Sequence, residues 1–337
     1  MGSVKDLEIL KQPQTENMGK GRFLFSDRYS VFDWGEMPDH IPHKGESLCL
    51  ITAYFFEKLE EMGINTHYRG LIENDTLKNL SDLNNPSNNL EVSLVRVIKP
   101  EFKNGEYDYS AYDNNLANYL IPLEIIYRNT LPEHSSFRKR VEQGKINIKD
   151  YGLEKLPPPG ETLENPIYDV STKLESSDRY ISWEEAKKIA GLNDNEIEQI
   201  TELLSRVNNL ITEEAKKADL KNLDGKIELA FDENRKLMVV DAVGTPDECR
   251  FAYNNFSISK EAIRKHYRDT EWYQEVTKAK KTQGPNWKEK VSCTPDPLPE
   301  EILQAVSELY MLCTNKITER EWFKDISSFT EIKEVLN

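Results

Sequence analysis

Two short β-prone runs separated by five polar residues constrain the fold of this chain more than any other feature. Residues 227–231 and 237–243 flank the sequence Asp-Glu-Asn-Arg-Lys, a pattern typical of an antiparallel hairpin. Side chains alternate between the two faces of a strand, so Asp224, Lys226 and Glu228, spaced two residues apart, project from the same face. The hairpin therefore predicts a strand face that carries two carboxylates and a lysine.

A third carboxylate, Asp241, lies at the far end of the predicted hairpin. Pairing of Phe231 with Leu237 would bring Glu228 within one residue of Asp241. Two facing carboxylates repel each other unless a cation lies between them, and Mg²⁺ is commonly held by one or two carboxylates together with substrate phosphates. A solvated strand face with a lysine–glutamate pair explains the same spacing, so the spacing alone leaves both interpretations open.

Composition limits the kind of protein and its partners. A chain of 337 residues suggests about two domains at roughly 150 residues each. The balance of 44 Lys and Arg against 59 Asp and Glu gives a net charge of -15, which argues against nucleic-acid binding. A mean hydropathy of -0.68 argues against a membrane protein. Four cysteines without C-x-x-C spacing, and an N-terminus without a basic and apolar signal, predict a cytoplasmic protein.

The N-terminal part of the chain has mixed β and α character. Residues 22–25, 91–98 and 123–127 have strand-like composition. Apolar residues recur at steps of three and four between Lys44 and Gly63, which predicts a helix that ends at the glycine. The polar, Tyr- and Asn-rich residues 103–118 are expected to form a surface insertion.

The second half is expected to be richer in helices. The run Pro-Pro-Pro-Gly at 157–160 predicts a loop and a hinge region, after which the helices begin. Ser182 followed by Glu185 forms a capping-box pattern for a helix that stops near Gly191. A second helix is predicted from about Asn193, with its inner face formed by Ile197, Ile200, Leu204, Val207 and Ile211.

Short motifs follow one another along the chain, and their order is as informative as their content. They are Gly19-Lys20-Gly21-Arg22, Ser26-Asp27-Arg28-Tyr29-Ser30-Val31-Phe32-Asp33, Ile41-Pro42-His43-Lys44-Gly45, Leu123-Glu124-Ile125-Ile126-Tyr127-Arg128, Ser136-Phe137, Ser171-Thr172-Lys173-Leu174-Glu175, Asp224-Gly225-Lys226-Ile227-Glu228, Asp241-Ala242-Val243-Gly244-Thr245-Pro246-Asp247-Glu248-Cys249-Arg250-Phe251 and Pro297-Leu298-Pro299-Glu300-Glu301. This collinear set, from about residue 18 to 316, resembles the SAICAR synthetase family of purine biosynthesis.

The resemblance implies an α+β fold of two lobes with a nucleotide cleft between them. Residues 1–127 would form a β-rich ATP-binding lobe, and residues 128–337 a mixed α/β lobe that carries the nucleotide-substrate and metal residues. The implied activity is that of an ATP-dependent carbon–nitrogen ligase. In the family, L-aspartate is joined to the carboxylate of carboxyaminoimidazole ribonucleotide (CAIR) through an acyl phosphate, which gives SAICAR, ADP and phosphate. ATP, Mg²⁺, CAIR and aspartate are the implied ligands, and a homo-oligomer is compatible with the sequence.

Residue roles follow from the resemblance position by position. The implied catalytic residues are Asp224, Lys226 and Arg250. The implied ATP-binding residues are Gly19, Lys20, Gly21, Arg22, Lys44, Val95 and Val97. The implied substrate-binding residues are Asp27, Arg28, Ser30, Asp33, Arg128, Ser136, Lys173 and Arg250. Glu228 and Asp241 would ligate Mg²⁺. Guanidinium groups suit these roles because their donors match the geometry of phosphate and carboxylate.

Several positions depart from the family pattern. Ala242 stands where the family usually has Glu, Cys249 where Ser is usual, and Ser177-Asp178 where a His-Asp pair often occurs. The step from Arg128 to Ser136 is also longer than in the family. Two alternatives therefore stay open: a small-molecule kinase with a fold like that of inositol-phosphate kinases, and a non-catalytic relative that binds nucleotide.

Overall fold

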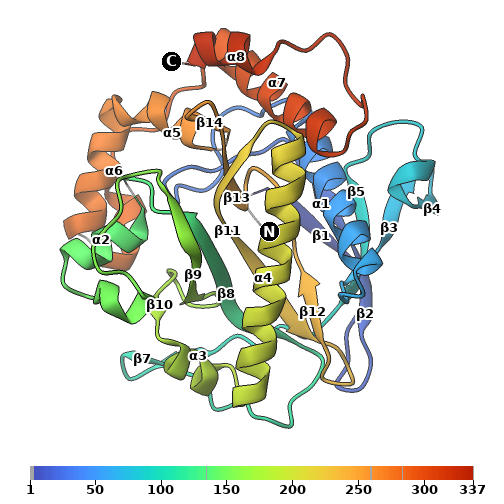
Figure 1. Cartoon of the computed structure of the whole chain (residues 1–337), viewed down its shortest axis with the longest axis vertical. Helices are drawn as coiled ribbons and strands as arrows, with labels where there is room; N and C mark the ends of the chain where they lie inside the picture. Colours follow the sequence, from blue (N-terminus) through green and yellow to red (C-terminus); the bar gives the residue numbers. More distant parts are fainter. Residues whose placement is uncertain (1–3, 134, 259, 283, 337) are drawn as a thin grey trace.

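Two antiparallel sheets organise the protein in the computed structural model, which describes residues 4–133, 135–258, 260–282 and 284–336 (Figure 1). The first sheet has the order β1 (Lys5–Lys11), β2 (Gly19–Phe25), β5 (Asn89–Leu94), β3 (Tyr68–Glu73) and β4 (Thr76–Lys78). The second has the order β10 (Tyr180–Ile181), β9 (Thr162–Thr172), β8 (Tyr119–Thr130), β11 (Lys221–Phe231), β13 (Cys249–Tyr253) and β14 (Phe256–Ile258), with β12 (Leu237–Val240) also paired to β11. A separate hairpin consists of β6 (Glu101–Lys103) and β7 (Glu106–Asp108).

Helices cover the sheets and close the C-terminal end. They are α1 (Lys44–Glu61), α2 (Ser136–Glu142), α3 (Trp183–Ile189), α4 (Asp194–Lys217), α5 (Glu261–Arg268), α6 (Glu271–Thr282), α7 (Glu300–Ile317) and α8 (Phe329–Leu336). Helix α1 packs on the first sheet and against α7, whereas the long α4 crosses β8 and β11 of the second sheet (Figure 1).

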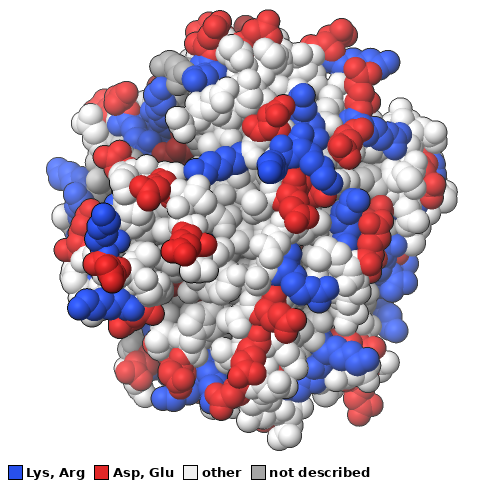
Figure 2. All heavy atoms as spheres, in the orientation of Figure 1, with Lys and Arg blue, Asp and Glu red and all other residues white. Residues whose placement is uncertain are grey.

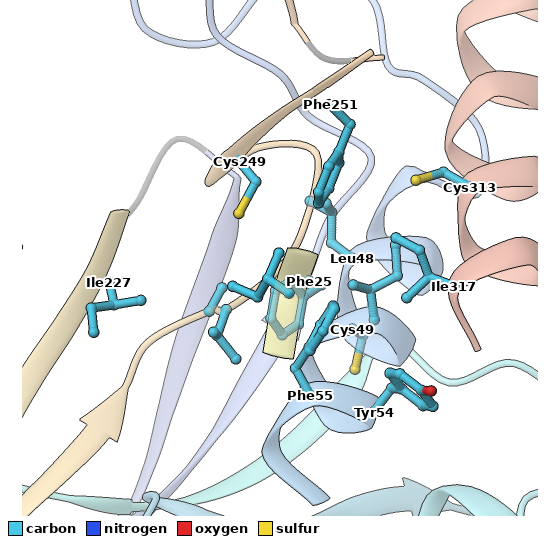
Figure 3. Packing of buried hydrophobic residues seen from close by; sticks show 14 of the residues in the cluster. Phe25, Leu48, Cys49, Tyr54, Phe55, Ile227, Cys249, Phe251, Cys313 and Ile317 are labelled. Atoms are coloured by element: carbon cyan, nitrogen blue, oxygen red, sulfur yellow. The ribbon is translucent and has the colours of Figure 1, made fainter. Parts of the chain in front are cut away.

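The two sheets share one hydrophobic core. Phe25 from β2, Phe55 from α1, Ile227 from β11, Phe251 from β13 and Ile317 from α7 belong to the same buried cluster (Figure 3). Isolated parallel bridges between residues 66 and 239 and between 96 and 119 also join the sheets. The lobe boundary expected at 127/128 falls inside β8, and the division into two lobes stays a prediction.

Local sequence signals account for the helix termini. Helix α1 ends at Glu61 and is followed by Gly63 in a left-handed conformation, as its sequence predicts. Ser182 accepts a hydrogen bond from the backbone N–H of Glu185 at the start of α3. Asn193 and Glu196 form a full capping box at the start of α4. These helix predictions are confirmed.

The predicted hairpin is confirmed in its register. Phe231 pairs with Leu237 and Glu228 pairs with Val240, so that Asp241 follows directly. Strand β12 is shorter than expected because it ends at Val240, after which Asp241 adopts a positive φ of 71°. The strand predicted over residues 91–98 likewise ends at Leu94.

Two expectations about chain organisation need correction. The helices do not begin only after the Pro-Pro-Pro-Gly loop, because α2 precedes it. The strands β9 and β10 lie between this loop and α3. The signal for α2 was present in Ser135, whose side chain caps the helix by accepting a hydrogen bond from the N–H of Arg138. The insertion at residues 103–118 is mostly exposed, yet Tyr112 and Asn118 are buried, so it docks on the protein.

Charge is distributed without a single dominant field on the face seen in Figure 2, where acidic and basic side chains are interspersed. Within the described residues, no helix has both the length and the apolar character that a membrane span requires.

Gly244 allows the loop after β12 to approach α1. Its φ is +71°, and a Cβ built there would lie 2.1 Å from a ring carbon of buried Phe55. We expect Gly244→Ala to lower the free energy of unfolding by about 3 kcal/mol, because strain and overpacking add. Gly63→Ala is the matched control: φ is +75° with no atom within 4 Å, so only about 1 kcal/mol of strain is expected. Equal effects in urea denaturation would contradict the packing role.

Candidate functional site

Strand alternation places charged side chains on one face of the second sheet. On β8, Glu124, Ile126 and Arg128 share a face, and they pair directly with residues 228, 226 and 224 of β11. Asp169 of β9 lies opposite Ile126, and Arg250 of β13 lies opposite Asp224. The other face of these strands contributes Ile125, Tyr127, Val170 and Ile227 to the core. The same strands therefore separate a polar face from the hydrophobic core.

A cavity of about 370 Å³ opens on this polar face. Its lining includes Glu124, Ile126, Arg128, Ser136, Asp178, Tyr180, Asp224, Gly225, Lys226, Pro246, Asp247, Glu248, Cys249, Arg250, Lys260 and Arg264. Five positions predicted from sequence, Arg128, Ser136, Asp224, Lys226 and Arg250, are brought together here. The structure thus joins motifs that are more than 120 residues apart in the chain.

Arg128 is a fully buried guanidinium with several partners. Its Nη2 donates to Oδ2 of Asp169 at 3.2 Å, to Oγ of Ser136 at 3.1 Å and to the Tyr180 hydroxyl at 3.3 Å. Asp169 also accepts a hydrogen bond from Arg140. Two guanidinium groups share this one carboxylate, which leaves an excess of positive charge beside the cavity.

Lys226 and Arg250 occupy the centre of the cavity wall. Lys226 Nζ lies 2.6 Å from Glu124 Oε1 and 3.2 Å from Glu248 Oε2. Burial disfavours the ammonium, but the carboxylates of Glu248 and Glu124 outweigh it and raise the pKa of Lys226. Arg250 binds Asp224 through two nitrogen atoms, with Nε at 2.7 Å from Oδ1. Both cations are therefore fixed and charged at neutral pH.

Glu228 and Asp241 lie close enough to influence each other, as the hairpin predicts. Burial raises the pKa of Glu228 to about 7, with the Asp241 charge as the second cause. Lys173 donates to Glu228, and Lys5 Nζ lies 2.7 Å from Asp241. Burial opposes the charge on Asp241, yet Lys5 and Lys173 lower the pKa of this carboxyl overall. The two carboxylates thus depend on lysines for charge compensation.

The residues expected to bind ATP phosphates form a separate group on β2. Lys20 Nζ lies 2.7 Å from Glu91 Oε1, and Arg22 and Arg69 contact the same buried carboxylate. Three cations around one acid leave net positive charge on this face of the first sheet. These residues are not in the lining of the 370 Å³ cavity.

The glycines on either side of Lys20 are required by the packing of the chain. A Cβ on Gly19 would lie 2.3 Å from the Lys11 carbonyl oxygen, and one on Gly21 would lie 2.8 Å from that of Glu8. The space is filled by β1 and the residues that follow it. Close approach of the chain itself therefore leaves no room for a Cβ at either glycine, and their contact with ATP stays a prediction.

Val95 and Val97, expected beside adenine, have different environments. Val95 packs on a small apolar cluster of Ala230, Met238 and Val240, which lies apart from the main core. Val97 is 53% exposed. Both residues follow the end of β5, and Arg96 between them forms an isolated bridge with Tyr119 of β8.

Lys44 is buried and not available at the surface. Its Nζ lies 2.9 Å from Oδ2 of Asp247, a carboxylate that also lies 3.1 Å from Lys260 and accepts a hydrogen bond from Tyr310. Burial lowers the pKa of Lys44. Lys44 thus supports the cavity wall from behind through Asp247.

Most polar side chains of the loop from Asp27 to Asp33 form hydrogen bonds or ion pairs within the protein. Asp27 accepts a hydrogen bond from the Gly45 N–H at the start of α1, and Arg28 lies 2.8 Å from Asp6. Ser30 Oγ accepts from the Gly35 N–H. Asp33 is exposed and pairs with Lys280 at 2.6 Å. None of these four side chains lines the 370 Å³ cavity among the described residues.

Sequence reasoning assigned no role to several residues of the site. These are Glu124, Arg140, Asp169, Asp178, Tyr180, Asp247, Glu248, Lys260 and Arg264. A usable signal existed for Glu124, because it lies four residues before Arg128 on a strand and therefore shares its face. The others come from loops, helices and the strands β9 and β10, and their proximity depends on tertiary pairing.

The position of Glu228 and Asp241 is compatible with a magnesium ion. The described residues contain no group of three or more His, Cys, Asp or Glu side chains arranged to hold a metal by themselves. Mg²⁺ does not need such a cage, because it retains waters and takes one or two carboxylates together with phosphate oxygens. Buried Glu228 and partly exposed Asp241, which repel each other, provide the hard oxygen donors that this ion prefers.

Two joined antiparallel sheets, with a cavity lined by five basic and five acidic side chains, define an α+β protein with a charged site. The chain matches the family model of SAICAR synthetase over residues 11–280. An Archaeoglobus fulgidus protein with the provisional name phosphoribosylaminoimidazole-succinocarboxamide synthase is 53% identical over 341 aligned residues, covering 100% of both chains. The synthase of that name from Thermoplasma volcanium is 33% identical, covering 89% of this chain and 93% of its own. The chain therefore belongs to the SAICAR synthetase family.

Solved structures of the family have the same fold. A SAICAR synthase from Saccharomyces cerevisiae in complex with SAICAR superposes with a TM-score of 0.64 at 22% identity, covering 96% of this chain and 94% of its own. A SAICAR synthetase in complex with ADP gives a TM-score of 0.56 at 22% identity, covering 88% and 99%. The expected α+β fold class is confirmed.

Asp169 compensates the charge of two guanidinium groups, and its removal tests that role. We expect Asp169→Asn to lower the free energy of unfolding by about 3 kcal/mol, because buried Arg128 loses its nearer counterion and keeps only Asp224, at 3.9 Å. Asp194→Asn is the control, since Asp194 forms an exposed pair with Lys187 and its loss should leave stability nearly unchanged. Similar stability of Asp169→Asn and wild type in urea titrations would contradict this role.

Proposed function

We propose that this protein ligates L-aspartate to the carboxylate of CAIR with ATP hydrolysis, forming SAICAR, ADP and phosphate. The observation that carries this proposal is the convergence of Arg128, Ser136, Lys226 and Arg250 on one cavity. The substrate carries a phosphate and a carboxylate, so it needs cations at separate points of a single cavity. Membership of the SAICAR synthetase family gives the reaction, and the cavity supplies the matching charges.

Arg128, Ser136 and Arg250 are proposed to hold the nucleotide phosphate. A guanidinium presents parallel donors that match a tetrahedral anion, and the Ser136 hydroxyl adds a neutral donor beside it. Asp169 and Asp224 already orient the two arginines through hydrogen bonds. The phosphate would therefore meet groups whose positions are fixed before it binds.

Lys226 is proposed to orient the substrate carboxylate for phosphoryl transfer. Its ammonium remains charged between Glu124 and Glu248 and faces the cavity. A carboxylate is a poor acyl donor, so ATP first converts it into an acyl phosphate, and the aspartate amine then attacks the acyl carbon and displaces phosphate. This chemistry depends on positioning and charge stabilisation rather than on a protein nucleophile.

Glu228 and Asp241 are proposed to hold Mg²⁺ together with ATP phosphates. When bound, the ion neutralises phosphate charge and favours phosphoryl transfer. Lys173 contacts Glu228 and is also near Asp241, so it would hold the carboxylates in place and screen their repulsion. The apolar cluster around Val95 is the proposed adenine contact, and Lys20 and Arg22 are the proposed phosphate contacts of the N-terminal sheet.

We also propose that the protein acts in the cytoplasm. The four cysteines are free thiols, and three of them are buried, which is compatible with a reducing cytoplasm. Self-association into a homo-oligomer stays a prediction from the sequence.

The test of the proposed function is ADP release by the purified protein with Mg²⁺-ATP and CAIR, with and without aspartate. We expect ADP and SAICAR to form in equal amounts, and only when aspartate is present, because the acyl phosphate needs the amine to break down productively. Phosphate transfer to a hydroxyl group without aspartate would favour a kinase. Stabilisation by ATP without any turnover would favour a non-catalytic nucleotide-binding protein.

Substitution of Glu228 tests the metal assignment. Glu228→Gln removes an anionic ligand at nearly constant volume, so the Mg²⁺ concentration for half-maximal activity should rise on the order of 10-fold. Asp75→Asn is the control, because this exposed carboxylate lies in the β3–β4 turn far along the chain from the site. An unchanged Mg²⁺ requirement in Glu228→Gln, measured as ADP release against Mg²⁺ concentration, would refute the assignment.

A further inference from the structure

The proposed ligation needs a proton acceptor, and none of the residues proposed to bind CAIR, ATP or Mg²⁺ supplies one. The α-amino group of aspartate is protonated at neutral pH and has no lone pair for attack on the acyl phosphate. A carboxylate that is already held by a fixed cation is a weak acceptor, since protonation would break the ion pair. A suitable base is therefore a cavity carboxylate without a cationic partner.

Carboxylates line the cavity at five positions: Glu124, Asp178, Asp224, Asp247 and Glu248. Glu124 and Glu248 both contact the ammonium of Lys226, at 2.6 Å and 3.2 Å. Protonation of either would remove a charge that keeps Lys226 ionised. Neither is free to act as the base.

Two further carboxylates are also engaged. Asp224 receives hydrogen bonds from two nitrogen atoms of Arg250. Asp247 lies between Lys44 at 2.9 Å and Lys260 at 3.1 Å, and these ammonium groups with burial hold it in a fixed place. Both carboxylates therefore serve to hold the cations of the cavity wall.

Asp178 differs from these four carboxylates. Among the described residues, it has no cation within ion-pair distance and no hydrogen-bond donor. The groups that face it are the carboxylates of Glu124 and Asp33 and the more distant ammonium groups of Lys226 and Lys173. Partial withdrawal from water, followed by the two carboxylates, raises the pKa of Asp178. A raised pKa strengthens a carboxylate as a proton acceptor.

The loop that carries Asp178 is anchored on both sides. Glu175 accepts hydrogen bonds from the Tyr109 hydroxyl at 2.8 Å and from Arg179, which also binds Glu185 of α3. Tyr109 belongs to the insertion whose role the sequence left open. The insertion thus holds the Asp178 loop at the cavity.

We propose that Asp178 binds the ammonium of the incoming aspartate and accepts one of its protons. This assignment rests on the proposed function. The freed nitrogen lone pair forms the C–N bond, and the bond between the acyl carbon and the phosphate oxygen breaks. The leaving phosphate takes the second nitrogen proton and departs as inorganic phosphate. Asp178 then returns its proton to water.

The experiment compares aspartate with hydroxylamine as the nucleophile, at saturating Mg²⁺-ATP and CAIR. Hydroxylamine is largely unprotonated at neutral pH and attacks an acyl phosphate without a base. We expect Asp178→Asn to lower kcat with aspartate on the order of 10²-fold, with KM for CAIR unchanged. ADP release with hydroxylamine should stay at the wild-type rate. Asp178→Glu should recover part of the aspartate rate, and Asp75→Asn should behave as wild type.

A pH profile provides the second measurement. Wild-type kcat with aspartate should fall as pH drops through the pKa of Asp178, because the base becomes protonated. In Asp178→Asn, the fall of kcat with decreasing pH should occur at higher pH, because the amine must then lose its proton to water. Loss of turnover with both nucleophiles, full retention of the aspartate rate, or an unshifted profile would each overturn the assignment. A wild-type protein that makes no SAICAR would instead refute the proposed function itself.

Discussion

Alternation of side chains along β8, β9 and β11 is the constraint on which the rest of the structure depends. One face of these strands carries Ile125, Val170 and Ile227 into the core that Figure 3 shows, and the opposite face carries the charged residues of the cavity. A slip of one residue in any of these strands would bury the charges and expose the core. The same hydrophobic burial that stabilises the fold therefore fixes which polar side chains meet.

The charged face is stable because almost every ion has a counterion in contact. Arg128 lies fully inside the protein, where an isolated guanidinium would cost several kcal/mol, yet Asp169, Ser136 and Tyr180 satisfy its donors. Asp247 is the counterion of buried Lys44, with its Oδ2 2.9 Å from Nζ. In a chain with a net charge of -15, the cavity thus gathers five basic side chains among five carboxylates, and contacts such as that of Asp224 with Arg250 hold the cations in place.

Local patterns predicted the hairpin, the helices α1, α3 and α4, and the convergence of Asp224, Lys226 and Glu228, because these depend on spacing within one segment. The sequence did not identify Arg140, Asp169 and Asp178 as residues of the site, because their proximity to the cavity arises from pairing between strands and loops far apart in sequence. Lys44 was correctly expected at the start of a helix, but its side chain is buried against Asp247. A sequence motif specifies a residue, whereas the direction of its side chain depends on tertiary packing.

Departures from the family pattern are easier to understand once the two faces are distinguished. Cys249 lies between the cavity and the core: it lines the cavity, and its Sγ lies 3.3 Å from the Tyr127 hydroxyl in space that Gly225 leaves. Ala242 is likewise buried among apolar residues, so a carboxylate there would need a partner. These substitutions change the core side of the site, while Glu228 and Asp241 remain on the polar side with their lysines. The residues that contact substrate in the proposed mechanism can therefore be retained while the layer behind them varies.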